Sequence, residues 1–351
     1  MKQLRNTVIR AGLGALYFSG AHVLLRPIFS GVGAIFMLHH VRPPRDAAFQ
    51  PNRHLEITPD FLRTMLGHLR ARSIDIVTMD EVHQRLTERN FSNRFACFTF
   101  DDGYRDNRDF ALPVMREFDA RFTLYVASNF AEGNGRLWWI ALEMAIAKAN
   151  AIEVTMGGMA CRLDTATVQA KQTAFDRLHD WLRMLPEHDL RREVTALCTR
   201  HGVDEAAICR DLCMSWDELK PVAGNPLVTI GAHTITHCNL AQQSETIARD
   251  ELALSRARIE AVLQRPAIHL AYPYGDKPAA GPREFALARA AGYKTAVTTR
   301  PGMVFPESAD HMTALPRVSL NGNYQDARIL PVLTSGAATA MWNGFRRVDA
   351  A

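Results

Sequence analysis

The sequence has few cysteines, no long run of basic residues and no uninterrupted apolar run long enough to cross a bilayer. Six cysteines among 351 residues do not form the dense disulfide framework of a small secreted domain. The 41 basic and 37 acidic residues are interspersed and leave a net charge of +4. This pattern gives no support to nucleic-acid binding, although it suits an anionic glycan or a membrane surface. Hydrophobic residues make up 47% of the chain, enough to bury the core of one large barrel domain or two smaller domains.

The first 30 residues combine a basic start with an apolar stretch. Residues 11–25 are largely apolar, and Arg26 and Pro27 end this stretch before it reaches the roughly 20 residues that span a bilayer. The order resembles a secretory signal, but no Ala-x-Ala cleavage region follows. We expect residues 1–30 to be a lead-in that packs on the domain or makes peripheral contact with a membrane. The protein would then be cytoplasmic or peripheral at the inner membrane, with export by an atypical or uncleaved signal as the alternative.

Short apolar runs alternate with segments of helical periodicity over much of the chain. Strands are predicted at residues 34–38, 74–79, 95–100, 122–127, 227–231, 268–272 and 293–298. Helices are predicted between them at residues 58–72, 106–118, 244–264 and 282–291. Strands that alternate with helices of this length are typical of βαβ units around a parallel sheet, so the fold class is α/β.

The segment at about residues 131–222 interrupts this alternation. It is rich in Ala, Leu, Glu, Arg and Met, and residues 173–185 and 189–201 have apolar side chains at helical spacing, which predicts a helical insertion. Near its start, Trp138 and Trp139 could offer a flat platform to sugar rings, with core packing as the alternative for at least one of them. Residues 321–351 lack strong periodicity and are interpreted as a C-terminal tail of uncertain order.

Two adjacent carboxylates follow one of the predicted strands. The apolar run 95–100 leads directly into Asp101, Asp102 and Gly103. Adjacent residues of a strand point to opposite faces, so both carboxylates can serve one site only where the strand has ended and the chain turns. Gly103 permits such a turn. Taken alone, an Asp-Asp-Gly turn that caps the next helix would be the simpler interpretation.

Two further polar clusters end apolar runs in the same way. Residues 227–231 lead into His233 and His237, whose spacing of four lets both imidazoles face one point if the segment is helical or tightly turned. Residues 270–276 read Leu-Ala-Tyr-Pro-Tyr-Gly-Asp and turn on proline and glycine. Ligands of parallel α/β folds bind at the carboxyl ends of strands, so three such clusters indicate one site rather than three surface turns.

These clusters resemble the motifs of the polysaccharide deacetylase family, also called the NodB homology or carbohydrate esterase family 4 group. The first motif, Thr-Phe-Asp-Asp-Gly-Tyr, stands at residues 99–104, and the second, His-[Ser/Thr]-x-x-His, stands at residues 233–237. The third reads Ala-Tyr-Pro-Tyr-Gly at residues 271–275, a form similar to the branch that includes poly-N-acetylglucosamine deacetylases. Residues 37–41 resemble the early strand end of that branch, with His39 in the place of its histidine. The resemblance covers residues 31–320 apart from the insertion.

The resemblance implies a fold, a reaction and a ligand set. The fold would be a distorted (β/α) barrel of the NodB type, with fewer than eight strands and the helical insertion. The reaction would be removal of an N-acetyl group from an amino-sugar oligosaccharide, polysaccharide or lipid-linked glycan. Asp102, His233 and His237 would hold a divalent metal ion, with zinc expected and cobalt, nickel or iron as alternatives. Asp101 would be the base, and the backbone N–H of Tyr274 would hold the oxyanion.

The chain departs from the family pattern at two places. Ala271 replaces the arginine that orients the base, and Arg317 is the candidate to replace it, with an exposed surface arginine as the alternative. The late histidine that acts as the acid is not recognisable, so His39 is the candidate acid, with His40 expected to point away and a structural role for His39 as the alternative. Two other functions stay open: a deformylase or other small-amide hydrolase of the same fold, and a glycan-binding relative without turnover.

Overall fold

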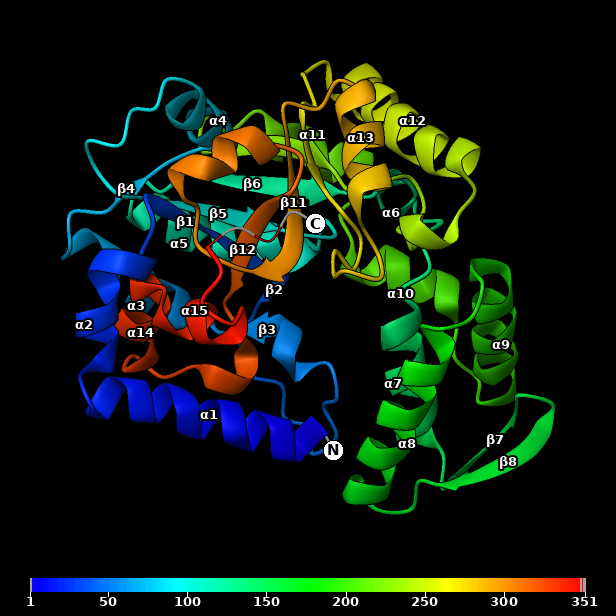
Figure 1. Cartoon of the computed structure of the whole chain (residues 1–351). Helices are drawn as coiled ribbons and strands as arrows, with labels where there is room; N and C mark the ends of the chain where they lie inside the picture. The colour runs from blue at the N-terminus through cyan, green and yellow to red at the C-terminus, as the bar shows by residue number, and fades with distance from the viewer. Residues whose placement is uncertain (1, 348, 350–351) are drawn as a thin grey trace.

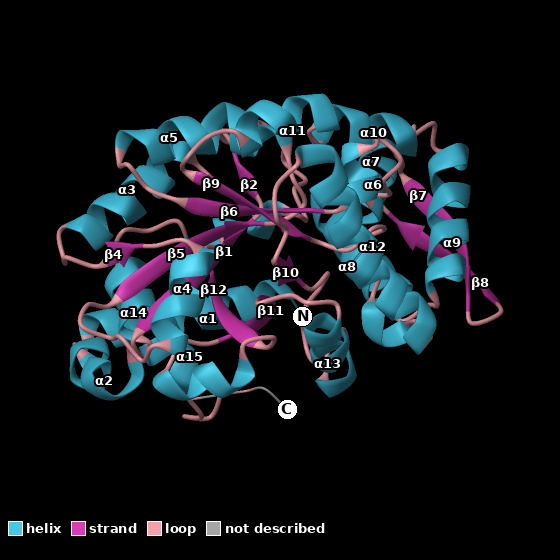
Figure 2. Ribbon diagram, turned by 90° about the horizontal axis from the view of Figure 1, so that it is seen from above, coloured by secondary structure: helices cyan, strands magenta, loops and turns pink. Residues whose placement is uncertain are grey.

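A closed ring of parallel strands forms the centre of the computed structural model, which describes residues 2–347 and 349 (Figures 1 and 2). Within these residues the ring has seven strands: β1 (Gly33–Leu38), β5 (Phe95–Phe100), β6 (Phe122–Val126), β9 (Val228–Ala232), β10 (His269–Ala271), β11 (Thr295–Pro301) and β12 (Leu315–Ser319). They neighbour one another in the order β1-β12-β11-β10-β9-β6-β5, and β1 also pairs with β5, which closes the barrel. The predicted (β/α) barrel with fewer than eight strands is therefore confirmed.

Both faces of the barrel strands are buried, which explains their nearly continuous apolar sequences. Alternate residues of β1 and β5 point to opposite sides. Ile35 and Cys97 belong to one core cluster, whereas Phe36 and Phe98 belong to the larger cluster under the surrounding helices. The short strand β4 (Asp75–Ile76) lies beside the start of β5 and covers less of the predicted segment 74–79.

Helices surround the barrel, and short elements connect them. The helices are α3 (Pro59–Arg70), α4 (Met79–Thr87), α5 (Leu112–Glu117), α6 (Ser128–Ala131), α11 (Trp216–Ala223), α12 (Glu245–Leu263) and α13 (Pro282–Ala290). The connections include the strands β2 (His40–Val41) and β3 (Glu56–Ile57) and the turns η1 (Arg53–Leu55), η2 (Asn107–Ala111), η3 (Leu240–Gln242), η4 (Pro306–His311) and η5 (Gly322–Tyr324). Side-chain caps fix several helix starts: Thr58 accepts a hydrogen bond from the Phe61 N–H, and Ser244 accepts one from the Ile247 N–H.

The insertion stands to the right of the barrel in Figure 1 and has its own apolar core. It contains α7 (Trp138–Lys148), α8 (Val168–Leu182), α9 (Glu187–Arg200) and α10 (Glu205–Leu212), together with an antiparallel hairpin of β7 (Ala151–Met156) and β8 (Met159–Asp164). The helical pattern did not predict this hairpin. Its signal was Gly157-Gly158, which both have positive φ and turn the chain tightly between the strands.

Both tryptophans at the start of the insertion belong to its core. Trp138 is 4% exposed and Trp139 is 6% exposed. Neither offers an open face to a sugar ring, so the prediction of an exposed tryptophan platform is wrong. The physical reason is that α7 lies between the barrel end and the remaining helices of the insertion, which bury both indoles.

The two ends of the chain pack against each other. The helices α1 (Lys2–Phe18) and α2 (Ala21–Phe29) contact α14 (Ile329–Ser335) and α15 (Ala337–Trp342), with Leu13 and Leu16 buried against Val332. Much of the segment interpreted as a tail is thus helical. Met1 of the lead-in and residues 348, 350 and 351 of the tail lie outside the described residues. None of the described helices is long and apolar enough to cross a membrane alone, and only the pair α1–α2, bent by 93°, meets that criterion together.

Candidate active site

The two adjacent carboxylates enter one buried site because the chain turns directly after β5. The Asp101 N–H still continues the sheet by donating a hydrogen bond of 2.9 Å to the Leu38 carbonyl. Asp102 has φ 73° and Gly103 has φ 69°, so the strand ends between the two acids. Both aspartates are almost fully buried. The turn therefore overrides the alternation of a strand and brings both acids to the carboxyl end of the barrel.

The two histidines are held by a tight loop after β9. Thr234 and His237 both have positive φ, and the His237 N–H donates a hydrogen bond to the Thr234 hydroxyl oxygen at 3.0 Å. The carboxylate of Glu251 on α12 accepts hydrogen bonds from the N–H groups of Ile235 and Thr236, at 2.8 and 2.9 Å. Glu251 thereby fixes the loop so that both imidazoles reach the same point.

Asp102, His233 and His237 converge as a potential metal-binding group. Asp102 Oδ1 lies 3.4 Å from His233 Nε2 and 3.3 Å from His237 Nε2. Ligand bonds of about 2.0–2.1 Å in a tetrahedral zinc site place neighbouring ligand atoms about 3.3 Å apart, which is the spacing found here. Among the described residues Asp102 Oδ1 is buried without a hydrogen-bond partner. These three side chains therefore fit a small divalent ion.

The charge and orientation of this group also suit a cation. The carbonyl of Ala271 lies 2.7 Å from His233 Nδ1, which assigns the proton to Nδ1 and leaves Nε2 free to face Asp102. Burial raises the pKa of Asp102, but the neighbouring His233 and His237 outweigh it and hold the pKa well below its usual range. Burial lowers the pKa of His237 to about 4, so its imidazole is neutral near pH 7.

Arg317 on β12 forms a two-pronged ion pair with Asp101. Its Nη1 and Nη2 atoms lie 2.8 and 2.7 Å from Asp101 Oδ1 and Oδ2, and its Nε–H donates to the Thr298 carbonyl at 2.8 Å. Burial raises the pKa of Asp101, but the guanidinium outweighs burial and lowers it, so the carboxylate stays ionised. Arg317 is 1% exposed, so it is not a surface arginine. Arg317 therefore orients the Asp101 carboxylate, a task that the methyl side chain of Ala271 cannot perform.

The adjacent histidines after β1 point to different surroundings. His39 Nε2 lies 3.9 Å from Asp101 Oδ2, and burial is the main cause that lowers the pKa of His39. His40 Nδ1 instead lies 2.6 Å from Asp106 Oδ2, and its ring stacks on Tyr104 at a centroid distance of 3.6 Å. The structure thus brings His39, and not His40, to the proposed base.

Tyr274 connects the site with the insertion. It follows β10 with φ 60°, and the Thr299 hydroxyl donates a hydrogen bond of 2.6 Å to its carbonyl. The indole N–H of Trp138 donates a hydrogen bond of 2.8 Å to the Tyr274 hydroxyl. The ring centroid of His237 lies 5.1 Å from that of Trp139 and 5.3 Å from that of Tyr274. The tryptophans are therefore walls of the site, a role that sequence reasoning missed.

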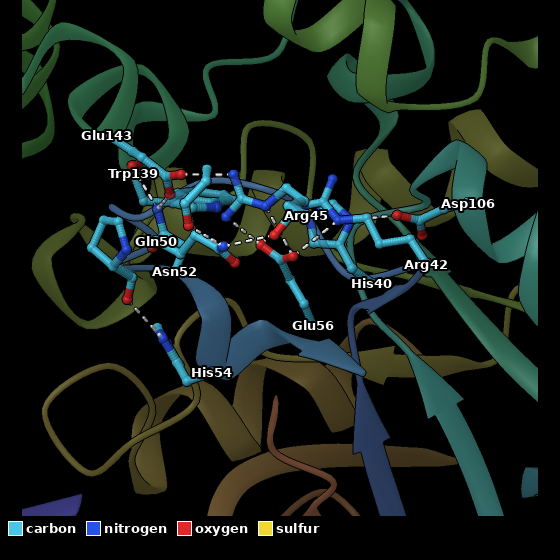
Figure 3. A network of polar contacts seen from close by, with 12 residues as sticks. His40, Arg42, Arg45, Gln50, Asn52, His54, Glu56, Asp106, Trp139 and Glu143 are labelled. Atoms are coloured by element: carbon cyan, nitrogen blue, oxygen red, sulfur yellow. Dashed lines mark hydrogen bonds and ion pairs between the residues drawn. The ribbon is translucent and has the colours of Figure 1, made fainter. Parts of the chain in front are cut away.

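A polar network fastens α7 to the segment between β2 and β3 (Figure 3). Glu56 accepts hydrogen bonds from Arg42 and Arg45, and Arg45 Nη1 reaches Glu143 Oε1 at 2.8 Å. Asn52 donates to the Glu143 carboxylate at 2.8 Å and to the Trp139 carbonyl at 3.0 Å. The network therefore fixes the helix whose tryptophans wall the proposed metal site.

A cavity of about 730 Å³ has Arg317 in its lining, whereas Asp102, His233 and His237 do not line it. Its walls include Ile9 and Leu13 of α1, Pro51 and His54 from the segment between β2 and β3, Phe175 and His179 of α8, Thr299 of β11, and Trp342 of α15. The volume is that of a typical small-molecule pocket, so the cavity has room for one or two sugar units.

The comparisons with known proteins agree with the barrel fold. The family model described as polysaccharide deacetylase matches residues 88–296. A Streptococcus pyogenes deacetylase, PplD, solved in complex with acetate, superposes with a TM-score of 0.55 at 18% identity over 83% of this chain and 92% of its own. IcaB from Ammonifex degensii superposes with a TM-score of 0.51 at 17% identity, over 82% of this chain and 91% of its own. A polysaccharide deacetylase from Bacillus cereus superposes with a TM-score of 0.52 at 16% identity, over 82% of this chain and 65% of its own. No curated protein matches the sequence.

Proposed function

This chain belongs to the polysaccharide deacetylase family, and we propose that it is a metal-dependent hydrolase that removes N-acetyl groups from an amino-sugar glycan. The observation that carries the proposal is the buried convergence of Asp102, His233 and His237 beside an ionised Asp101. The S. pyogenes relative was solved with acetate, the product of such a reaction, and we extend this acyl group to the present site.

Asp102, His233 and His237 would hold the ion, and zinc suits one carboxylate and two imidazoles, as do cobalt, nickel and iron. A bound divalent ion supplies a water of lowered pKa and polarises the substrate carbonyl. Three protein ligands leave positions open for this purpose. The group lies at the carboxyl ends of β5 and β9, where ligands of parallel barrels bind.

The other residues of the site would move protons and hold charge. Water oxygen bonds to the acetyl carbon while Asp101, held by Arg317, accepts a water proton. The backbone N–H of Tyr274 donates to the carbonyl oxygen as negative charge develops there. The carbon–nitrogen bond then breaks as the nitrogen takes a proton from the protonated form of His39, and the water proton held by Asp101 passes back to His39, whose Nε2 lies 3.9 Å from Asp101 Oδ2. The products are a free amine and acetic acid, which ionises to acetate.

The test is metal analysis of the purified protein together with assays of acetate and formate release. Chitooligosaccharides, poly-N-acetylglucosamine fragments and peptidoglycan are the substrates. We expect bound metal and acetate, and we expect loss of both in the variants Asp102→Ala, His233→Ala and His237→Ala. Formate alone would assign a deformylase instead. Wild-type metal content and activity in all three variants would show that the proposed site is wrong.

A further inference from the structure

An apolar face lies outside the barrel, where α1 and α2 meet. Its side chains are Phe18, Val23, Leu24 and Ile28, with Phe345 beside them because its ring packs 5.7 Å from that of Phe29. Phe18 is 74% exposed and Leu24 is 79% exposed, and α2 has no buried residue. We call these five side chains the elbow face. Large apolar side chains gathered in this way mark an interaction surface.

The first 30 residues of the sequence, which include α1 and α2, carry charged residues of one sign only. That segment contains Lys2, Arg5, Arg10 and Arg26 and no aspartate or glutamate. Arg26 is exposed between Leu24 and Ile28, and Arg346 and Arg347 follow Phe345 in the sequence. A basic apolar helix surface attracts the anionic lipids of a bilayer. The exposed Arg26 would repel the Arg26 of a second copy docked on this face.

The packing of α1 keeps the elbow face at the outside of the molecule. Leu13 and Leu16 of α1 are buried against α14 and α15, so one side of this helix is already occupied. The 93° bend at Ser19 and Gly20 turns α2 away from the line of α1 (Figure 1). A continuous span would need both helices to straighten and to leave their contacts with α14 and α15. The elbow therefore suits shallow burial of its apolar side chains at a lipid surface.

We propose that the elbow face binds the surface of an anionic phospholipid bilayer. The apolar side chains enter the boundary between headgroups and acyl chains, while the arginines remain at the phosphate level. Because α1 also lines the cavity that reaches Arg317, through Ile9 and Leu13, binding of the elbow face holds this cavity within about one helix length of the lipid surface.

The experiment is co-flotation of the purified full chain with two kinds of vesicle. One contains phosphatidylcholine alone, and the other contains phosphatidylcholine mixed with phosphatidylglycerol. We expect binding to the anionic vesicles that falls as salt is added, since the attraction between charges is screened. The variant Leu24→Glu should bind at least about tenfold more weakly, because it places a charge where an apolar side chain enters the lipid.

The matched control is Leu254→Glu, the same substitution at an exposed leucine of α12, and it should bind like the wild type. Circular dichroism melts of both variants show that the fold is kept. Equal binding of the wild type and Leu24→Glu, or binding that does not need the anionic lipid, would overturn the proposal. So would self-association without vesicle binding, measured by sedimentation, which would assign the face to a second copy. Activity is not the readout, so failure here is separate from failure of the proposed reaction.

Discussion

Strained backbone gathers at the candidate active site. Residues other than glycine with positive φ include Asp102, Thr234, His237 and Tyr274. Each such conformation costs about 1–3 kcal/mol and persists only where surrounding contacts enforce it. Here the contacts are the carboxylate of Glu251 under the histidine loop and the hydroxyl of Thr299 on the Tyr274 carbonyl. The site is therefore organised by the fold before any ligand arrives.

Asp101→Asn should keep bound metal and lower kcat by about 10²- to 10⁴-fold, because an amide has nearly the same shape but cannot accept the proton of water. The variant should also be less stable, since it leaves the buried guanidinium of Arg317 without its carboxylate. Metal content, kcat and denaturant unfolding measure these effects.

The double variant Asp101→Asn, Arg317→Met is the control for this loss of stability. Removing the unpaired charge should restore part of the free energy of unfolding without restoring activity. Loss of metal in Asp101→Asn would show that Asp101 and Asp102 have exchanged roles, and full activity would remove Asp101 as the base.

His39→Ala should keep the metal and lower kcat strongly on an N-acetyl substrate, because an amine leaves poorly without a proton. The loss should be much smaller on an ester whose leaving group needs no proton. His40→Ala is the comparison. Since His40 pairs with Asp106 and stacks on Tyr104, its removal should lower stability without changing the ratio of amide to ester turnover. Equal losses of both activities in His39→Ala would contradict the assignment.

At the scale of elements, the link between α7 and the β2–β3 segment should control the wall of the site. Glu143→Gln keeps an acceptor for Asn52 but removes the charge that faces Arg45. We expect a loss of about 1–3 kcal/mol in the free energy of unfolding and a higher KM, because α7 holds the two tryptophans against His237 and Tyr274. Urea unfolding and steady-state kinetics measure both.

The control for Glu143→Gln is an exposed ion pair in the same insertion. Glu153 and Arg162 lie on the hairpin β7–β8 and are both well exposed, so Glu153→Gln should cost at most about 1 kcal/mol and leave KM unchanged. If Glu143→Gln had no larger effect than Glu153→Gln, the network would not position α7.

The sequence predicted the barrel elements best where an apolar run coincides with a buried strand. The run at residues 95–100 is β5 without any shift, and residues 244–264 differ from α12 by one residue at each end. Strand β12 was not predicted, because Pro316 and Arg317 break its apolar pattern. The charge of this arginine is balanced inside the barrel by Asp101, a partner far away in the sequence that no local pattern reveals.

In the candidate site, too, some residues could be identified from the sequence and others could not. Motifs at strand ends identified the carboxylates and histidines, since those residues stand next to strong apolar runs. The contacts of Trp138 and Trp139 with Tyr274 and His237 depend on how the insertion docks, and spacing along the chain does not encode that docking. For the same reason the sequence left open an exposed platform for one tryptophan, with core packing expected for at least one of the two.

At the scale of the whole molecule, one glycine controls how the chain ends meet. Gly336 joins α14 to α15 with φ 76°, and a Cβ atom there would lie 1.9 Å from the Phe29 carbonyl oxygen. Gly336→Ala should therefore lower the free energy of unfolding by roughly 2–4 kcal/mol and loosen α1 and α2. Thermal melts and the rate of proteolysis within residues 1–30 report these two effects.

Gly344→Ala separates the two causes of that loss. Gly344 also has positive φ, but a Cβ atom there would meet no other atom within 4 Å, so its substitution carries backbone strain without the clash. It should cost about 1 kcal/mol and leave proteolysis near the N-terminus unchanged. Similar losses in both variants would show that Gly336 does not hold the chain ends together.

Closure of the barrel sets the order in which the chain folds during synthesis. Phe36 of β1 lies beside Phe98 on one side and beside Val318 on the other. Because β12 comes last in the chain, the ribosome releases β1 and β5 long before it releases β12, the strand that closes the barrel. Until then one edge of β1 has no partner and is exposed to aggregation and to chaperones. We expect slow folding whose last step is the arrival of β12, which also delivers Arg317 to Asp101 and so completes the proposed catalytic pair only when the barrel is shut.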